Sequence, residues 1–136
     1  MASATLVDEI EKIVERLRQA RGELVLAMLY SSFEGGDGGW NFIVSAPWTD
    51  KLGMVESIRV LAEALRSGLS KENISEISRV TPLETGDPFV RAITSVISAA
   101  GPGTRANISN SNFGGVPIPR GILFYSQREA PGTSSG

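Results

Sequence analysis

The sequence contains no cysteine and no histidine among its 136 residues. The lack of cysteine excludes disulfides, thiolate metal sites and cysteine nucleophiles, and it fits a reducing compartment. The lack of histidine removes the side chain that most readily exchanges protons near neutral pH and the commonest nitrogen ligand of transition metals. An enzyme with this sequence is therefore limited to carboxylates, to a serine activated by a lysine or carboxylate, or to Mg²⁺ held by oxygen ligands.

Long apolar runs and concentrated basic charge are missing as well. No apolar run reaches the roughly 18 residues that a membrane helix needs, and the segment MASATLVDEIEK is acidic where a secretory signal would be basic. We therefore expect a cytoplasmic protein without a membrane span. The net charge of −2 argues against nucleic acid as the main partner. The C-terminal arginines are scattered, which is typical of a solvated surface: Arg79, Arg91, Arg105, Arg120 and Arg128.

The composition is that of an ordinary globular domain. Apolar residues make up 41% of the chain and charged residues 21%, so neither a disordered nor a fibrous protein is indicated. A chain of this length buries a real core without metals or disulfides. We expect a single globular domain over residues 1–128 and a disordered tail over residues 129–136.

Three segments carry apolar residues at helical spacing. The first opens at Thr5 and ends at Gly22, the second follows a turn and cap at residues 47–50 and ends at Gly68, and the third starts at Asp87 and Pro88. Their apolar positions are Leu6, Ile10, Ile13, Leu17 and Ala20; Met54, Val55, Ile58, Leu61, Ala62, Leu65 and Leu69; and Phe89, Ile93, Val96, Ile97 and Ala100.

Five segments are predicted as strands. Residues 24–30 and 41–46 are apolar on both faces and fit central strands, and residues 77–80 fit a short strand. Residues 105–110 and 121–126 fit the two strands of a late hairpin. Their connection, residues 111–120, is rich in Asn, Gly and Pro, and a surface loop is favoured over a binding loop.

These elements predict an α/β (α+β) fold with the order α-β-β-α-β-α-β-β. The natural architecture is a mixed sheet of about five strands covered by three helices, mainly on one face, because each helix has one stripe to bury and the strands need a cover.

A glycine-rich acidic segment between the first two strands is the main candidate for a ligand site. Its candidate residues are Ser31, Ser32, Glu34 and Asp37. Glu34 and Asp37 would hold Mg²⁺ together with Asp50 if the sheet brought the three together, since hard cations prefer carboxylate oxygens. A hairpin turn with two solvated acids is the simpler interpretation, because glycine supplies positive φ and acids keep turns soluble.

Three aromatic residues are candidates for contact with a partner. Trp40 and Trp48 bracket the second strand, and we expect one of them in the core and the other facing a partner, because tryptophan is enriched at interface centres. Phe113 lies in the predicted 111–120 connection, where it is available for the same role.

The layout of residues 5–98 resembles that of minimal nucleotidyltransferase-like domains. The resemblance rests on a helix, a strand ending LYSS, a short Gly-rich acidic segment, the strand WNFIVSA, a helix, and then ISRVTPLETGDPFVRAI. That family carries Gly-Ser after the first strand and an Asp-x-Asp pair that holds Mg²⁺. The corresponding places here read Ser31-Ser32 and Trp40-Asn41-Phe42, so the metal pair is absent. The resemblance therefore implies a catalytically inactive relative.

Two functions of different class follow from the sequence. The missing set of catalytic residues favours a non-catalytic cytoplasmic domain that acts through protein contacts, as a regulatory or oligomerisation module without a cofactor. Its partner would be another protein or a second copy of the chain. The alternative is a nucleotide- or phosphate-binding domain, a degenerate nucleotidyltransferase that would use Ser31, Ser32, Glu34 and Asp37, with Mg²⁺ as a possible cofactor.

Overall fold

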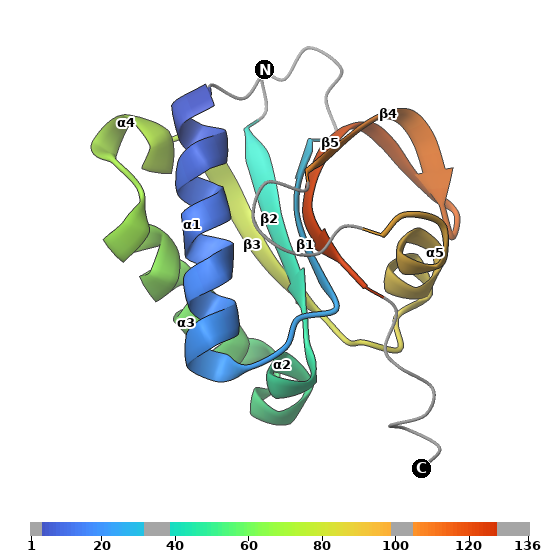
Figure 1. Cartoon of the computed structure of the whole chain (residues 1–136), viewed down its shortest axis with the longest axis horizontal. Helices are drawn as coiled ribbons and strands as arrows, with labels where there is room; N and C mark the ends of the chain where they lie inside the picture. Colours follow the sequence, from blue (N-terminus) through green and yellow to red (C-terminus); the bar gives the residue numbers. More distant parts are fainter. Residues whose placement is uncertain (1–3, 32–38, 99–104, 128–136) are drawn as a thin grey trace.

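A computed structural model describes residues 4–31, 39–98 and 105–127 of the chain. Over these residues, helices pack on a single five-stranded mixed sheet (Figure 1). The predicted α/β (α+β) fold class is therefore confirmed. The tail predicted at residues 129–136 lies outside the described residues.

The first predicted helix is α1, Ala4–Arg21. Apolar residues at alternating four- and three-residue spacing form its buried face. These are Leu6, Ile10, Ile13, Val14 and Leu17. The helix ends at Gly22, whose φ of 114° suits glycine. The N–H of Gly22 donates a hydrogen bond of 3.0 Å to the carbonyl of Arg18, which satisfies one of the free carbonyls of the last turn.

Two buried strands follow as an antiparallel pair. They are β1, Leu26–Ser31, and β2, Trp40–Ser45, with Leu26 opposite Ser45 and Tyr30 opposite Asn41. Nearly every residue of both strands is buried, as the apolar runs predict for central strands. The structure begins and ends them within two residues of the predicted limits.

The turn predicted at residues 47–50 is wrong, because these residues form a short helix, whereas the helix predicted after them is confirmed and ends at Gly68. Pro47 begins the short helix α2, Pro47–Leu52, and the Thr49 hydroxyl accepts a hydrogen bond of 3.0 Å from the N–H of Ala46. Gly53 then takes a φ of 84°, which breaks the helical path. The chain continues as α3, Met54–Gly68, and the single turn α4, Lys71–Ile74.

The apolar stripe predicted for this segment is only partly buried. Leu61 and Leu65 are at most 3% exposed in the core beneath α1. Met54, Val55 and Ile58 lie on the solvent side of α3. The expectation that the whole stripe is core is therefore wrong, because the stripe is wider than the face that α3 turns to the sheet.

The third strand and the last helix complete the central part of the fold. β3, Ile77–Leu83, runs parallel to β2 after the helical crossover and extends past the predicted end at residue 80. It is an edge strand, so Pro82, which has no N–H, does not remove a hydrogen bond from the interior of the sheet.

The last helix is α5, Pro88–Val96. Before it lies Asp87, whose Oδ1 accepts a hydrogen bond of 2.8 Å from the N–H of Phe89. Phe89 and Ile93 are buried, whereas Val96 is exposed, contrary to the predicted stripe.

The late hairpin is longer than predicted. Its strands are β4, Ala106–Phe113, and β5, Val116–Ser126, so the surface loop expected over residues 111–120 is wrong. The turn consists of Gly114 and Gly115, whose φ angles are 59° and 83°. Two residues with positive φ match the twist of a tight hairpin, and glycine adopts that conformation without strain. The pair therefore allows both strands to continue up to the turn.

The sheet has the strand order β3-β2-β1-β5-β4 and separates two cores (Figure 1). On one face, α1 and α3 pack against a cluster that includes Trp40 and Phe42. On the other face, α5 packs against a cluster that includes Met28 and Ile43. The described helices thus cover both faces, and α5 is the one among them that packs against the second. None of the described helices is both long and apolar enough to cross a membrane.

Candidate functional site

The predicted ligand residues occupy the end of β1 and the segment after it. Ser31 is the last residue of β1, is 1% exposed, and lies opposite Arg120 of β5. Ser32, Glu34 and Asp37 lie outside the described residues. A hydroxyl buried within a sheet is not accessible as a nucleophile, so Ser31 does not by itself form a catalytic site.

Asp50, the third predicted Mg²⁺ ligand, has a structural role. Its Oδ1 accepts a hydrogen bond of 3.1 Å from the N–H of Thr85, and its Oδ2 accepts one of 2.6 Å from the hydroxyl of Thr85. These bonds connect α2 to the turn before α5. In the ranges 4–31, 39–98 and 105–127, no three acidic side chains are grouped in a way that could hold a metal ion.

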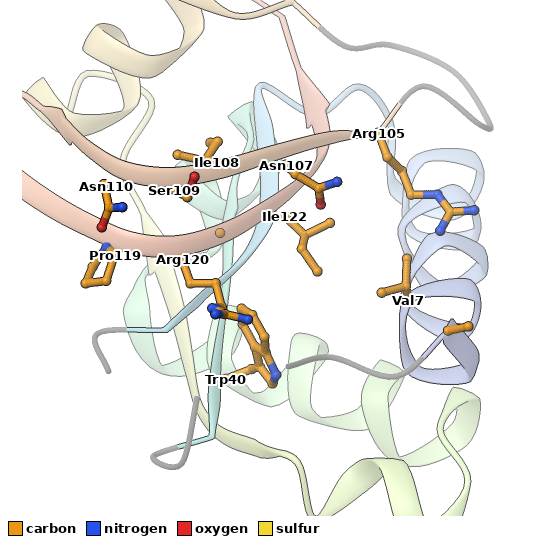
Figure 2. A pocket seen from close by; sticks show the side chains of 12 residues that line it. Val7, Trp40, Arg105, Asn107, Ile108, Ser109, Asn110, Pro119, Arg120 and Ile122 are labelled. Carbon is orange, nitrogen blue, oxygen red and sulfur yellow. The ribbon is translucent and has the colours of Figure 1, made fainter. Parts of the chain in front are cut away.

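A cavity of about 780 Å³ lies on the α1 side of the late hairpin. Side chains of β4 and β5 form its floor, and α1, the first residue of β2 and the residue before β4 form its walls (Figure 2). Its described lining consists of Ala4, Val7, Trp40, Arg105, Asn107, Ile108, Ser109, Asn110, Pro119, Arg120, Gly121 and Ile122. A volume of this size is typical of small-molecule sites.

An irregularity in the hairpin lies at the cavity floor. Asn110 has a φ of 47° and no partner in the β4–β5 register, which passes from Ser109 opposite Arg120 to Ser111 opposite Ile118. The facing residue is Pro119, which has no N–H to donate to a ladder bond. The register is the same on both sides of this position. β4 and β5 are curved in Figure 1.

The charged residues of the described lining are both arginines. Arg105 is ion-paired with α1, with its Nη2 3.3 Å from Asp8 Oδ1 and its Nε 2.7 Å from Glu11 Oε1. Arg120 is only partly exposed, and no carboxylate among the described residues forms an ion pair with it. The cavity therefore combines one neutralised guanidinium with one that has no counter-ion in this part of the chain.

The other side chains of the lining divide into polar and apolar groups. Asn107 and Ser109 are exposed on β4, opposite Ile122 and Arg120 of β5. Directly opposed residues of a strand pair project to the same face. Val7, Ile122 and Trp40 supply the apolar part. Figure 2 shows Val7 and Trp40 away from β4, and Ile122 beside Asn107 on the floor. The arrangement suits a ligand with a charged end and an apolar body.

The three predicted interface residues occupy different environments. Trp40 is 1% exposed and belongs to the core, as expected for one of the two tryptophans, and leaves little of its surface for contact with a partner. Trp48 is partly buried on α2, with the guanidinium of Arg21 5.9 Å from its ring centroid. Phe113 is partly buried at the end of β4 against the second core. Partner contact through Trp48 or Phe113 stays a prediction.

Exposed apolar side chains gather instead at the junction of α2 and α3. The α2–α3 apolar surface consists of Leu52, Met54, Val55 and Ile58, which are 37%, 59%, 71% and 38% exposed. Single exposed apolar residues are ordinary, but four of the five large ones that are exposed in the described part of the chain lie within residues 52–58, and apolar surface concentrated in this way is typical of contact sites.

Sequence reasoning missed the cavity residues because it treated the arginines as scattered and residues 111–120 as a loop. One signal was present in the sequence. A Gly-Gly pair between alternating residues predicts a two-residue hairpin turn, and such a turn determines the register of the strands. That register places Arg120 opposite Ser109, so the polar floor was in principle accessible from the sequence.

Comparison of the chain with protein-family models, with curated proteins and with solved structures gave no match. The resemblance to nucleotidyltransferase-like domains therefore stays a prediction.

Proposed function

We propose that this chain is a non-catalytic domain that acts through protein contacts, and that its partner is a second copy of itself. The observation that carries this proposal is the α2–α3 apolar surface. Burial of apolar area is the main favourable term in protein association. A chain that leaves Met54 and Val55 more than half exposed gains free energy when another surface covers them.

The charges around this surface favour a second copy over a strongly charged partner. Asp50, Lys51, Glu56 and Arg59 are neighbours of the apolar side chains in the sequence, and Glu84 and Asp87 line a hollow together with Met54, so charges of both signs lie around this surface. Glu56 and Arg59 lie 3.7 Å apart on the same helix. Because the rim carries both signs, charges on one copy can pair with opposite charges on a second copy. In a two-fold dimer the same patch serves on both copies.

Self-association through a patch of this size is expected to be weak, because four side chains cover less area than a standard stable interface. In sedimentation velocity, the wild-type chain should shift from monomer to dimer as its concentration rises. The V55E variant should stay monomeric at the same concentrations, since the dimer would bury two unpaired carboxylates.

V96E is the matched control for this experiment. Val96 is 72% exposed on α5, which closely equals the exposure of Val55, but it lies on the other face of the sheet. V96E should dimerise like the wild type. A wild-type chain that sediments as a monomer throughout, or a V55E variant that still dimerises, would contradict the proposal.

The nucleotide-binding alternative rests on residues that the structure does not describe, apart from Ser31. It predicts a saturable, metal-dependent change in tryptophan fluorescence on addition of ATP, GTP or CTP, and loss of that change in D37N. A flat response from the folded protein would count against it.

A further inference from the structure

The cavity on the α1 side of the late hairpin has no role in the proposed self-association. Its lining belongs to α1, β2, β4, β5 and Arg105, whereas the α2–α3 apolar surface lies on a different pair of helices. The two features therefore call for separate explanations, and a test of one leaves the other open.

Arg120 carries the argument for a ligand in this cavity. Arg120 is partly buried, so its guanidinium loses part of its hydration without gaining a counter-ion from the described residues, and buried charges are normally paired. In the described part of the chain, Arg105 has such partners in Asp8 and Glu11, and Arg120 has none. The described lining contains no Asp or Glu. A bound anion would supply the missing charge.

Hydrogen-bond donors lie on the same face as Arg120. Ser109 is directly opposite Arg120, and Asn107 is opposite Ile122, so a hydroxyl, an amide and a guanidinium project from neighbouring positions of two paired strands. Figure 2 shows these side chains on the cavity side of the hairpin. Planar guanidinium groups bind carboxylate and phosphate oxygens through two parallel hydrogen bonds, and adjacent hydroxyl and amide donors add to that recognition.

The apolar wall indicates the rest of the ligand. Val7 of α1 and Ile122 of β5 border the cavity beside Trp40. An inorganic ion alone would leave this wall and most of the roughly 780 Å³ unused. A small organic molecule would cover the wall with its apolar body and place its charge at Arg120.

We propose that this cavity binds a small organic anion, with a phosphate or carboxylate group held by Arg120, Ser109 and Asn107 and an apolar body against Val7 and Ile122. Arg120 is the residue on which affinity depends most. Arg105 completes the wall and adds positive potential, although its ion pairs with α1 reduce that contribution.

The chain contains its own reporter for this test. It has two tryptophans, so the W48F variant leaves Trp40, which borders the cavity, as the only one. Phenyl phosphate, benzoate and inorganic phosphate are titrated into W48F at constant ionic strength while Trp40 emission is followed. At least one of the two aromatic anions should give a saturable change at lower concentration than inorganic phosphate, because only they cover the apolar wall. The ratio of their affinities tells whether the site prefers phosphate or carboxylate.

Two variants of the W48F chain connect binding to Arg120. R120Q removes the cation and should weaken the affinity for the aromatic anion by about tenfold or more, the usual effect of losing a hydrogen bond to a charged group. S109D places a carboxylate opposite Arg120 in the strand register and should abolish binding by pairing with it. Because Ser109 is exposed, S109D should fold normally, and its melting temperature should equal or exceed that of its parent.

R91Q is the matched control for loss of a positive charge. Arg91 is exposed on α5, across the sheet from the cavity, so R91Q should bind as its parent does. The proposal is overturned if neither aromatic anion gives a saturable change, or if folded S109D and R120Q bind as tightly as their parent. Because Leu52, Met54, Val55 and Ile58 are unchanged in all these variants, failure here leaves the self-association proposal unaffected.

Discussion

The pKa of Tyr125, near the end of β5, depends on the residues around its hydroxyl. Its hydroxyl lies 3.1 Å from Glu23 Oε2 and 2.7 Å from Gln127 Oε1. Burial, and then the negative charge of Glu23, raise the pKa of Tyr125 from 10.0 to about 12. Both effects oppose formation of the phenolate, so the folded state retains this proton more strongly than the unfolded state does.

The stability that follows from this pKa has a definite sign. Because the folded-state pKa lies above the unfolded value, the contribution of Tyr125 is fully present below pH 10.0 and is lost as the pH rises toward about 12. In Y30F, Tyr125 is the only tyrosine. We expect absorbance near 295 nm to give a pKa close to 12 in native Y30F and close to about 10 after unfolding in denaturant. Equal values in the two states would contradict the prediction.

Arg120 is the residue that local sequence reasoning could least interpret. In the sequence it is one of several separated arginines, and a solvated surface is the ordinary interpretation of such a pattern. Its significance depends on Ser109, which the hairpin register places opposite it, and on Trp40, which is far away along the chain and borders the same cavity only after β2 and β5 have joined the sheet.

At the scale of elements, the contact between α1 and α3 depends on a glycine. A Cβ added at Gly68 would lie 2.7 Å from Cδ1 of Ile13 and closer still to Cγ1, and Ile13 is 1% exposed in the core. The absence of a side chain at Gly68 therefore lets the two helices approach each other. The sequence predicted this glycine as a helix end, but not as a contact point.

We expect G68A to lower the free energy of unfolding by about 1–3 kcal/mol, the usual range for overpacking a core. Urea unfolding followed by far-UV circular dichroism measures this change. G86A is the matched control, since no atom lies within 4 Å of the position where its Cβ would be. If G68A were as stable as G86A, the helices would have room to separate without cost.

How much of the apolar stripe of α3 is buried is also decided at this scale. The apolar spacing from Met54 to Leu69 is continuous in the sequence and predicts one buried stripe. The structure buries Leu61 and Leu65 and leaves Met54, Val55 and Ile58 in solvent. Periodicity shows that a helix is amphipathic, but how much of its stripe is covered depends on the neighbouring elements.

At the scale of the whole molecule, β1 couples the two cores. Ala27 and Leu29 belong to the core under α1 and α3, and Leu26 and Met28 belong to the core under α5. All four are fully buried. The loss of either core should therefore expose one side of the same central strand, and the chain should unfold as one cooperative unit.

This coupling predicts the behaviour of two truncations. Leu61→Ala in the first core and Ile93→Ala in the second should each cost about 2–5 kcal/mol, because both side chains are fully buried. Tryptophan fluorescence reports the first core and far-UV circular dichroism reports the whole chain, and the two transitions should coincide in both variants. An I93A variant with separate transitions would show that the cores unfold independently.

The sequence by itself determined the fold class, the order of the main elements and the central position of β1 and β2. These features follow from local periodicity and from apolar runs, which depend only on residues close together in the chain. Only the tertiary structure decided three other features. These are the helices on both faces of the sheet, the cavity at Arg120, and the exposure of the apolar side chains on either side of Gly53. They depend on strand register, helix placement and the curvature of the late hairpin, which arise from contacts between residues far apart in the chain.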